Sequence, residues 1–333
     1  MKKFINMPEN VVTEMLEGLL AAHPDLLKSV ENNSKNLVRK DAPVQNKVAI
    51  ISGGGSGHLP LFLGYIGKGM LDGVAVGEIF ASPSSKQILD VTKAVDSGKG
   101  VLYLYGNYGG DIMNFDMAAE MAEMEGIQTA TVIGTDDVAS MPKGQESERR
   151  GVAGLFYLYK IAAAKAEEGA SLEEVVEIAQ FTNNNVRTMG VALSPCTLPE
   201  VGKPTFTIEE GKMELGMGIH GEPGYYKGDI QTADEVAETI VSKIYDDLVL
   251  EEGSKVSVLV NGLGATPLEE LYIIFRKVKN VLEEKKVSLH RAYVGEYATS
   301  LEMAGLSVSV LKLNDELERL LDQPFVTPFH VQP

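Results

Sequence analysis

One histidine of this chain lies within an unusual concentration of glycine. The stretch 215–226 reads LGMGIHGEPGYY, which puts His220 among glycines at positions 216, 218, 221 and 224. Glycine costs ~0.5–1 kcal/mol relative to alanine inside a helix or strand, so four of them around one side chain need a reason. A tight turn without chemistry is one explanation. The other is a small molecule that must reach the imidazole at close range.

A second histidine closes another glycine-rich stretch, SGGGSGH at 52–58. An apolar run at 47–53 predicts a buried strand just before it, and loops at the carboxyl ends of parallel strands are where open α/β sheets bind ligands. The backbone N–H groups of this loop and the ring of His58 could hold a small polar ligand. A tight strand-to-helix turn explains the same residues without one.

These glycine-rich stretches complete no nucleotide-binding motif. The third glycine of G-x-G-x-x-G is missing, and the hydrolase pattern G-x-S-x-G fails because its last position is His58. No Gly-Lys pair is followed by the Ser or Thr of a P-loop. We therefore expect no nucleotide or other cofactor on this chain itself.

A carboxylate follows the third predicted strand, in the segment GNYGGD at 106–111. Asp111 there comes just before a predicted helix at 112–125, where an aspartate commonly acts as the N-cap. It also lies on the same predicted sheet edge as His58, which allows a shared pocket. The residues alone leave both interpretations open.

The remaining polar clusters predict less chemistry. The five histidines and the single cysteine show no metal-ligand spacing, so no metal site is expected. Cys196 has no adjacent cation to activate it, and we expect it to be buried and inert. Four charged residues are interpreted as solvated loop residues and a helix start: Asp136, Asp137, Arg149 and Arg150.

Short apolar runs alternate with helical patterns through the first half of the chain. Runs rich in β-branched or aromatic residues predict strands at 47–53, 74–80, 100–108 and 128–134. Helical spacing is found at 86–97, at 112–125, at 149–168, and from Leu172 with Ser171 as N-cap. This alternation predicts an α/β domain with a mostly parallel sheet flanked by helices.

A polar run, TNNN at 182–185, interrupts the pattern and marks an expected boundary between domains 1–184 and 185–333. Beyond it, strands are predicted at 187–194, 255–264, 287–295 and 306–313, with helices at 232–247 and from Pro267. We expect a second, smaller α/β domain. It carries His220 between a strand and a Pro-Gly turn that exposes the ring.

Composition restricts the partners. The 333 residues include 30 Lys plus Arg against 47 Asp plus Glu, a formal charge of −17. Nucleic acids and anionic membranes require clustered cations, so neither is an expected partner. One cysteine, no secretory signal and no apolar run of membrane-spanning length predict a soluble cytoplasmic protein.

Six segments match a single family in order. They are SGGGSGH (52–58), GNYGGDIMNF (106–115), RRGVAG (149–154), GMGIHGEPG (216–224), VNGLGATPLEELY (260–272) and VGEYATSLEMAG (294–305). Together they resemble the dihydroxyacetone-binding subunit of dihydroxyacetone kinases. The resemblance covers essentially the whole chain, and several segments are too long and specific to match by chance.

This resemblance implies a role for each candidate site residue. His220 would attack the ketone carbon of dihydroxyacetone and form a covalent hemiaminal, which selects short ketones and aldehydes over glycerol. His58 and Asp111 would hold the substrate hydroxyl and take its proton as it attacks the γ-phosphoryl group. Four residues of the first loop would line the pocket: Gly54, Gly55, Ser56 and Gly57.

The resemblance also implies partners. The chain ends at Pro333, without the second half of the single-chain, ATP-dependent members, so it resembles the phosphotransferase-system-dependent type. In that type a separate subunit carries ADP or ATP with magnesium, and a phosphohistidine carrier protein rephosphorylates the ADP in place. The implied protein is the homodimeric substrate-binding subunit of a phosphoenolpyruvate–glycerone phosphotransferase in glycerol metabolism.

Two departures from the family pattern concern the substrate. Gly106 stands where a lysine usually precedes Asn-Tyr. After the first-loop histidine, the usual Glu-Pro and small residues or a second histidine are replaced by Leu59, Pro60, Leu61 and Phe62. A lost cation and added bulk beside the pocket leave the preferred ketone open.

Two alternatives follow from these departures. One is a kinase subunit for a related short ketose such as erythrulose. The other is a ketone-sensing paralogue that binds a transcription factor as its coactivator and needs no nucleotide subunit. The survival of His58, Asp111 and His220 favours the kinase subunit, because a sensor could lose the base.

Overall fold

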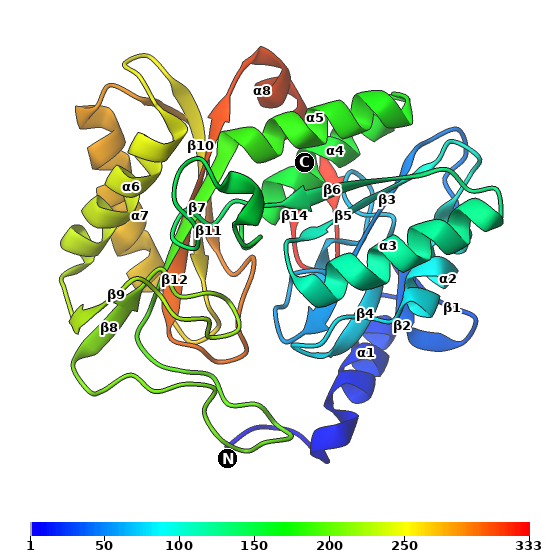
Figure 1. The fold of residues 1–333 in the computed structure, drawn as a ribbon, viewed down its shortest axis with the longest axis horizontal. Helices are drawn as coiled ribbons and strands as arrows, with labels where there is room; N and C mark the ends of the chain where they lie inside the picture. Colours follow the sequence, from blue (N-terminus) through cyan, green and yellow to red (C-terminus); the bar gives the residue numbers. More distant parts are fainter. Residues whose placement is uncertain (1) are drawn as a thin grey trace.

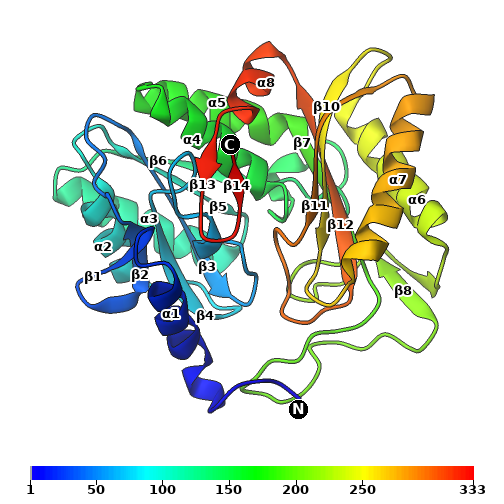
Figure 2. The same ribbon diagram turned by 180° about the vertical axis from the view of Figure 1, so that it is seen from behind.

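The computed structural model describes residues 2–333, which form two six-stranded sheets lying side by side (Figure 1). Strands β1–β6 build one sheet and β7–β12 the other, while a two-stranded ribbon, β13–β14, lies between them (Figure 2). Helices flank both sheets, which confirms the expected α/β fold. The second sheet has as many strands as the first.

The first sheet has the strand order β1-β2-β4-β3-β5-β6. Its last four strands run parallel, as expected, and two antiparallel strands that the sequence analysis missed extend one edge. The bounds are β1 (Leu27–Val30), β2 (Asn33–Arg39), β3 (Ala49–Ser56), β4 (Gly73–Ile79), β5 (Val101–Gly106) and β6 (Thr129–Gly134). The carboxyl ends of β3, β4 and β5 therefore open on one edge.

The second sheet has the strand order β11-β10-β12-β7-β8-β9 and is mostly antiparallel. Only β10 and β11 pair in parallel, across the helix that connects them. The bounds are β7 (Val186–Ala192), β8 (Lys212–Leu215), β9 (Tyr226–Asp229), β10 (Lys255–Gly262), β11 (Ser288–Gly295) and β12 (Gly305–Leu313). The ribbon strands are β13 (Phe325–Val326) and β14 (Val331–Gln332).

The helices of residues 2–333 are α1 (Val11–Ala22), α2 (Ser85–Val95), α3 (Gly109–Met124), α4 (Leu155–Glu167), α5 (Leu172–Asn185), α6 (Ala233–Leu248), α7 (Leu268–Glu284) and α8 (Asp315–Leu321). Six of these eight helices were expected from the sequence, whereas α1 and α8 were not. Three short 3-10 turns lie at Pro8–Asn10, Leu63–Tyr65 and Glu146–Glu148. Along residues 2–333, none of the helices combines the length and the apolar character needed to cross a bilayer.

Helix α4 packs between the two sheets. Eleven of its 13 residues are buried, so it has almost no solvent face. Tyr159 Oη lies 2.9 Å from the hydroxyl of Ser52 in β3, and Tyr157 Oη lies 3.0 Å from the hydroxyl of Ser257 in β10. Two tyrosines of one helix thus form hydrogen bonds to the two different sheets, and these bonds hold the sheets at a fixed separation.

Helix α5 corrects the expected break at 182–185. Ser171 caps this helix by accepting the Glu174 N–H, as expected, and the helix runs on through the polar run to Asn185. Strand β7 begins at the next residue. The chain therefore changes sheets at 185/186. The final segment, 314–333, follows the second sheet in the sequence but packs against the first half of the chain. Residues of α8 and Phe325 belong to the same hydrophobic core as α4.

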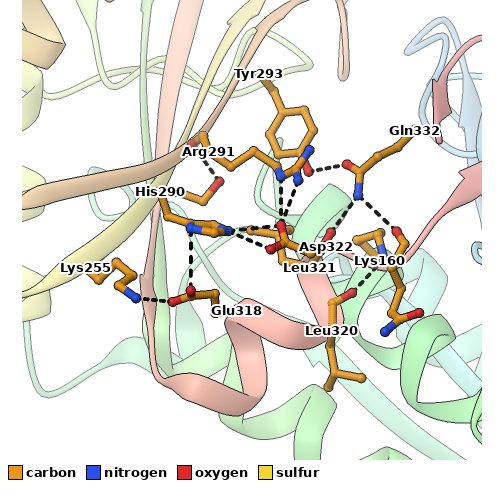
Figure 3. Close-up of polar contacts among 12 residues, drawn as sticks. Lys160, Lys255, His290, Arg291, Tyr293, Glu318, Leu320, Leu321, Asp322 and Gln332 are labelled. Atoms are coloured by element: carbon orange, nitrogen blue, oxygen red, sulfur yellow. Dashed lines mark hydrogen bonds and ion pairs between the residues drawn. The ribbon is translucent and has the colours of Figure 1, made fainter.

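A buried lysine joins α4 to this returning segment. Lys160 Nζ donates to the carbonyl oxygen of Leu320 in the last turn of α8 at 2.7 Å (Figure 3). Gln332 of β14 donates to the next carbonyl, that of Leu321, at 2.8 Å. Burial, and next the charge of Arg291, lower the pKa of Lys160 to about 7.

We predict that Lys160→Met stabilises the protein most at low pH. A lysine that titrates near 7 when folded and near 10.5 when unfolded destabilises the fold fully below pH 7, and this cost disappears as pH rises to 10.5. Urea unfolding should show a gain of roughly 2 kcal/mol at pH 6 that shrinks by pH 9.5. Lys165→Met, on the same helix but partly exposed, should show no such trend. A Lys160→Met protein less stable than its parent at pH 6 would contradict the argument.

Candidate active site

Five loops from the two sheets converge around His220. Three come from the first sheet: His58 follows β3, Phe80 follows β4, and Tyr108 follows β5. The second sheet supplies His220 from the connection between β8 and β9, and Thr299 from the connection between β11 and β12. The expected convergence of His58 and His220 in space is therefore observed, although 162 residues separate them.

The two histidine rings touch at their Nε2 atoms, 3.0 Å apart. His58 Nδ1 lies 2.7 Å from the carbonyl oxygen of Thr299, and a carbonyl can only accept, so Nδ1 carries a proton. His220 Nδ1 lies 2.8 Å from Glu222 Oε1, so an ionised Glu222 fixes a proton there too. The Nε2 contact is a hydrogen bond only if one further proton lies between the rings. With that proton the pair carries one positive charge, and without it both rings are neutral with their Nε2 lone pairs facing each other.

Aromatic rings hold this pair in a fixed orientation. His58 stacks on Phe80 with ring centroids 4.8 Å apart and an interplanar angle of 18°. Tyr108 and Phe80 both present their rings edge-on to His220, at 4.9 and 5.1 Å. His58 is 1 % exposed, whereas 26 % of the His220 side chain is exposed. His220 is the member of the pair that a small molecule can reach.

The surroundings favour neutral His58 and ionised Glu222. Burial, and next the charge of His220, lower the pKa of His58 to about 3. Burial alone would raise the pKa of Glu222. Hydrogen bonds from the His220 ring and from its backbone N–H, with Oε2 2.8 Å from that nitrogen, outweigh burial and bring it to about 2. A positive charge on the His220 ring would therefore lie beside an ionised carboxylate.

Asp111 lies within α3 and does not cap it. The N-cap position is Tyr108, which makes no side-chain cap, and α3 begins three residues earlier than expected. Asp111 is 7 % exposed, and its Oδ1 has no hydrogen-bond partner among the described residues. Burial raises its pKa to about 6, against the opposing effects of the Ser82 hydroxyl and His220. Such a carboxylate is ionised at pH 7 and can still accept a proton.

The four glycines around His220 accommodate the protein's own atoms. Gly216 has φ +79°, and a side chain there would meet Ala139 and Tyr225. A Cβ on Gly218 would collide with the carboxylate of Glu222 and the guanidinium of Arg150. Glycine at 218 is thus required by a close approach within the loop, where the sequence suggested approach of a ligand.

Of the four charged residues interpreted as loop residues and a helix start, Asp136, Asp137 and Arg149 are buried and Arg150 is partly buried. Asp136 accepts the N–H groups of Val152 and Gly154 ahead of α4, at 2.9 and 2.8 Å. Arg149 is fully buried and pairs with both carboxylate oxygens of Asp247 in α6, at 2.8 and 2.7 Å. The helix start predicted near Arg149 is wrong, because α4 begins at Leu155.

Asp137 and Arg150 pair with each other beside the His220 loop. Arg150 Nε donates to Asp137 Oδ2 at 2.9 Å. Sequence reasoning missed this pair, and it missed Tyr108 and Thr299 as well. Glu222, two residues after His220, was a visible sign of a site but was given no role. Cys196 is buried, as expected.

Comparisons with known proteins identify the family of this chain. The family model described as the Dak1 domain matches residues 17–329. A curated relative from Listeria innocua, "PTS-dependent dihydroxyacetone kinase 2, dihydroxyacetone-binding subunit DhaK", is 47 % identical over 329 residues, covering 99 % of both chains. The chain belongs to the Dak1 family.

Two solved structures share the Dak1 fold at 34 % identity. The dihydroxyacetone kinase of C. freundii, in complex with AMP-PNP and Mg2+, superposes with a TM-score of 0.90. The superposition covers all of the present chain and 61 % of the kinase chain. The "Dihydroxyacetone kinase operon co-activator Dha-DhaQ" superposes with a TM-score of 0.87 over 94 % of this chain and 96 % of its own. Kinases and a coactivator thus share one architecture.

The first glycine-rich loop of this Dak1 chain is tightly packed. A Cβ on Gly54 would fall within the ring of Phe62, one of the bulky residues that depart from the family pattern. Gly55 lies against the backbone of Phe80 and Ala81, and Ser56 donates its hydroxyl to the Gly77 carbonyl oxygen at 2.7 Å. Phe62 therefore occupies the space that a glycine at 54 leaves open.

No group of three or more potential metal ligands occurs within residues 2–333. The acids and histidines of this site are instead paired with each other, with aromatic rings and with main-chain groups. What the arrangement offers chemically is a partly exposed imidazole, a second imidazole in contact with it, and a buried carboxylate with one oxygen free of hydrogen bonds among the described residues.

We predict that Gly54→Ala destabilises the protein by about 1–3 kcal/mol, because the added methyl overlaps the Phe62 ring. Gly18→Ala is the matched control, since nothing lies within 4 Å of that Cβ on exposed α1; it should be neutral or gain up to ~1 kcal/mol. In a Phe62→Ala background the cost of Gly54→Ala should largely vanish in chemical denaturation. Equal costs in both backgrounds would show that Phe62 is not the obstacle.

Proposed function

We propose that this chain is the dihydroxyacetone-binding subunit of a phosphotransferase-system-dependent dihydroxyacetone kinase. The Listeria innocua relative that carries this name matches nearly end to end, at 47 % identity. The observation that carries the chemistry is the 3.0 Å contact between the Nε2 atoms of His58 and His220, together with the buried Asp111, whose Oδ1 has no partner among the described residues. Carbonyl addition followed by phosphorylation of a hydroxyl needs a nucleophile, an acid and a base.

The first step joins His220 to the ketone. When the proton between the rings lies on His58, the Nε2 lone pair of His220 is free to attack C2 of dihydroxyacetone. The C–N bond forms, the carbonyl π pair moves to oxygen, and His58 gives that oxygen its proton. The hemiaminal carries its positive charge on the His220 ring, whose Nδ1–H faces the Glu222 carboxylate. A histidine with a lowered pKa releases its proton readily, which suits His58 to this role.

The second step presents a hydroxyl to the phosphoryl donor. The adduct fixes the terminal hydroxyl in place, a proximity effect that can be worth ~7–11 kcal/mol. Asp111 then takes its proton as the oxygen attacks the γ-phosphoryl group of a nucleotide. We place that nucleotide and its magnesium on a separate kinase subunit, recharged by a phosphohistidine carrier, because this sequence contains no phosphate-binding motif. The proposal also includes that two copies of this chain form a homodimer.

We predict that His220→Ala abolishes covalent capture of the ketone. With [2-13C]dihydroxyacetone, the carbonyl resonance of bound ligand should move into the range of an sp3 carbon in the parent and stay at the carbonyl position in the variant. Erythrulose, longer by one CHOH group, serves as the competing ketone and glycerol as the blank. Retention of the sp3 signal by His220→Ala would assign the nucleophile elsewhere.

A second candidate is a ketone-sensing coactivator, which the Dha-DhaQ structure favours because it matches over almost the whole of both chains. A sensor needs only the adduct, whereas a kinase subunit also needs a base for the substrate hydroxyl. The kinase subunit therefore requires the carboxylate of Asp111, whereas the coactivator does not.

We predict that Asp111→Ala keeps most ketone binding but loses at least ~100-fold in turnover with the cognate kinase subunit and phosphocarrier. Because the pKa of Asp111 is raised to about 6, parent turnover should fall as pH drops below 6, where this carboxylate is protonated. His58→Ala should also lower turnover. A parent that captures ketone and binds a regulator, but turns over with no kinase subunit, would favour the coactivator.

A further inference from the structure

The loop that carries His220, residues 216–224, is held from the first half of the chain by one guanidinium. Arg150 lies in the connection between β6 and α4, and its Nη2 donates to the carbonyl oxygen of Gly216 at 2.9 Å. Its Nη1 lies 4.0 Å from Glu222 Oε2. One planar group thus faces both the start of this loop and the carboxylate that holds the His220 ring.

Arg150 is itself fixed by Asp137. The Nε and Nη2 atoms of Arg150 lie 2.9 and 2.8 Å from Asp137 Oδ2, while Asp137 Oδ1 accepts the Ala139 N–H at 3.0 Å. The main chains are also paired, since the Asp137 N–H donates to the Arg150 carbonyl oxygen at 3.1 Å. The side chains are 13 % and 3 % exposed. The guanidinium cannot turn away without breaking this pair in a buried site.

The glutamate beneath the loop sets which nitrogen of His220 is available. Glu222 uses Oε1 for the Nδ1–H of the ring and Oε2 for the backbone N–H of the same residue, so it grips His220 at two points. With the proton held on Nδ1, the neutral ring keeps its lone pair on Nε2, which faces His58. If Glu222 rotated away, the proton could move to Nε2, and a protonated nitrogen is no nucleophile.

We propose that Arg150, anchored by Asp137, is the positioning residue for this nucleophile: it fixes Glu222 and the start of the loop, and so keeps His220 in the Nδ1–H tautomer with Nε2 free. Arg150 touches no reacting atom. The inference rests on the proposed addition of His220 to a ketone. Its structural part, the tautomer, exists with or without substrate.

The neighbouring arginine provides a matched control. Arg149 is equally charged and fully buried, but it points to Asp247 of α6 and donates from Nε to the Met141 carbonyl oxygen. It makes no contact with residues 216–224 among the hydrogen bonds of residues 2–333. Arg149→Lys should therefore lower stability without changing the ring of His220.

The test uses the full chain in four forms besides Arg149→Lys. They are the parent, Arg150→Met with Asp137→Asn, Glu222→Gln, and all three substitutions together. Replacing Asp137 as well avoids leaving a buried carboxylate unpaired, so the double variant should fold. For each, 15N NMR of the histidine rings reports the tautomer without ligand, and [2-13C]dihydroxyacetone titrations from pH 5.5 to 8.5 report the adduct.

We expect the double variant to lose the single Nδ1–H form of His220 and to weaken the adduct by about tenfold or more, because it removes both the charge that faces Glu222 at 4.0 Å and the charge-assisted hydrogen bond to the Gly216 carbonyl oxygen. Glu222→Gln should act in the same direction and change the pH profile of adduct formation, since the balancing carboxylate is gone. Added to Glu222→Gln, the two further substitutions should weaken the adduct by clearly less than they do in the parent, because the part of their effect that passes through Glu222 is already lost.

Two results would overturn the inference. One is a folded double variant whose 15N spectrum and adduct match the parent. The other is a set of losses that multiply, which would mean that Arg150 stabilises the loop independently of Glu222. If the parent forms no adduct, the proposed function fails, while the 15N spectra still decide whether Arg150 holds the tautomer.

Discussion

The burial of α4 between two sheets is the constraint on which the site depends. A helix with almost no solvent face must bury every side chain without leaving polar atoms unpaired. Tyr157 and Tyr159 meet this requirement because their hydroxyls pair with serine hydroxyls of the two different sheets. These two bonds set the separation of β3 and β10. Because His58 follows β3 and Thr299 follows the strand beside β10, the same packing sets how closely their loops approach. The 2.7 Å contact between His58 and the Thr299 carbonyl is a consequence of the core.

The electrostatics of the site follow from that closeness. Two imidazoles and two carboxylates lie in a largely buried region, where hydrogen-bond partners decide the proton positions. A main-chain carbonyl and Glu222 each accept one Nδ1 proton, which leaves the two Nε2 atoms facing each other at 3.0 Å. Asp111 differs because its Oδ1 has no partner, and burial leaves it easier to protonate than an exposed aspartate.

Local patterns in the sequence were sufficient to predict most strands and helices. Alternating apolar runs located β3 to β6 within a few residues, and the Ser171 cap was read correctly. The errors come from contacts between distant residues. Arg149 looked solvated because its partner, Asp247, lies 98 residues away. Asp111 looked like a cap because the helix was expected to begin at residue 112, whereas α3 begins at Gly109. The glycines near His220 indicated empty space, but side chains of the same protein fill it.

The acceptor that fixes the tautomer of His58 is a main-chain atom. No substitution at position 299, other than one that moves the backbone, removes a carbonyl oxygen. The proton on His58 Nδ1 is therefore insulated from substitution of its acceptor. The proton on His220 Nδ1 is not, because its acceptor is the side chain of Glu222. The two rings of one pair thus differ in how much sequence change their protonation tolerates: exchange of a single side chain can alter His220 and leave His58 as it is.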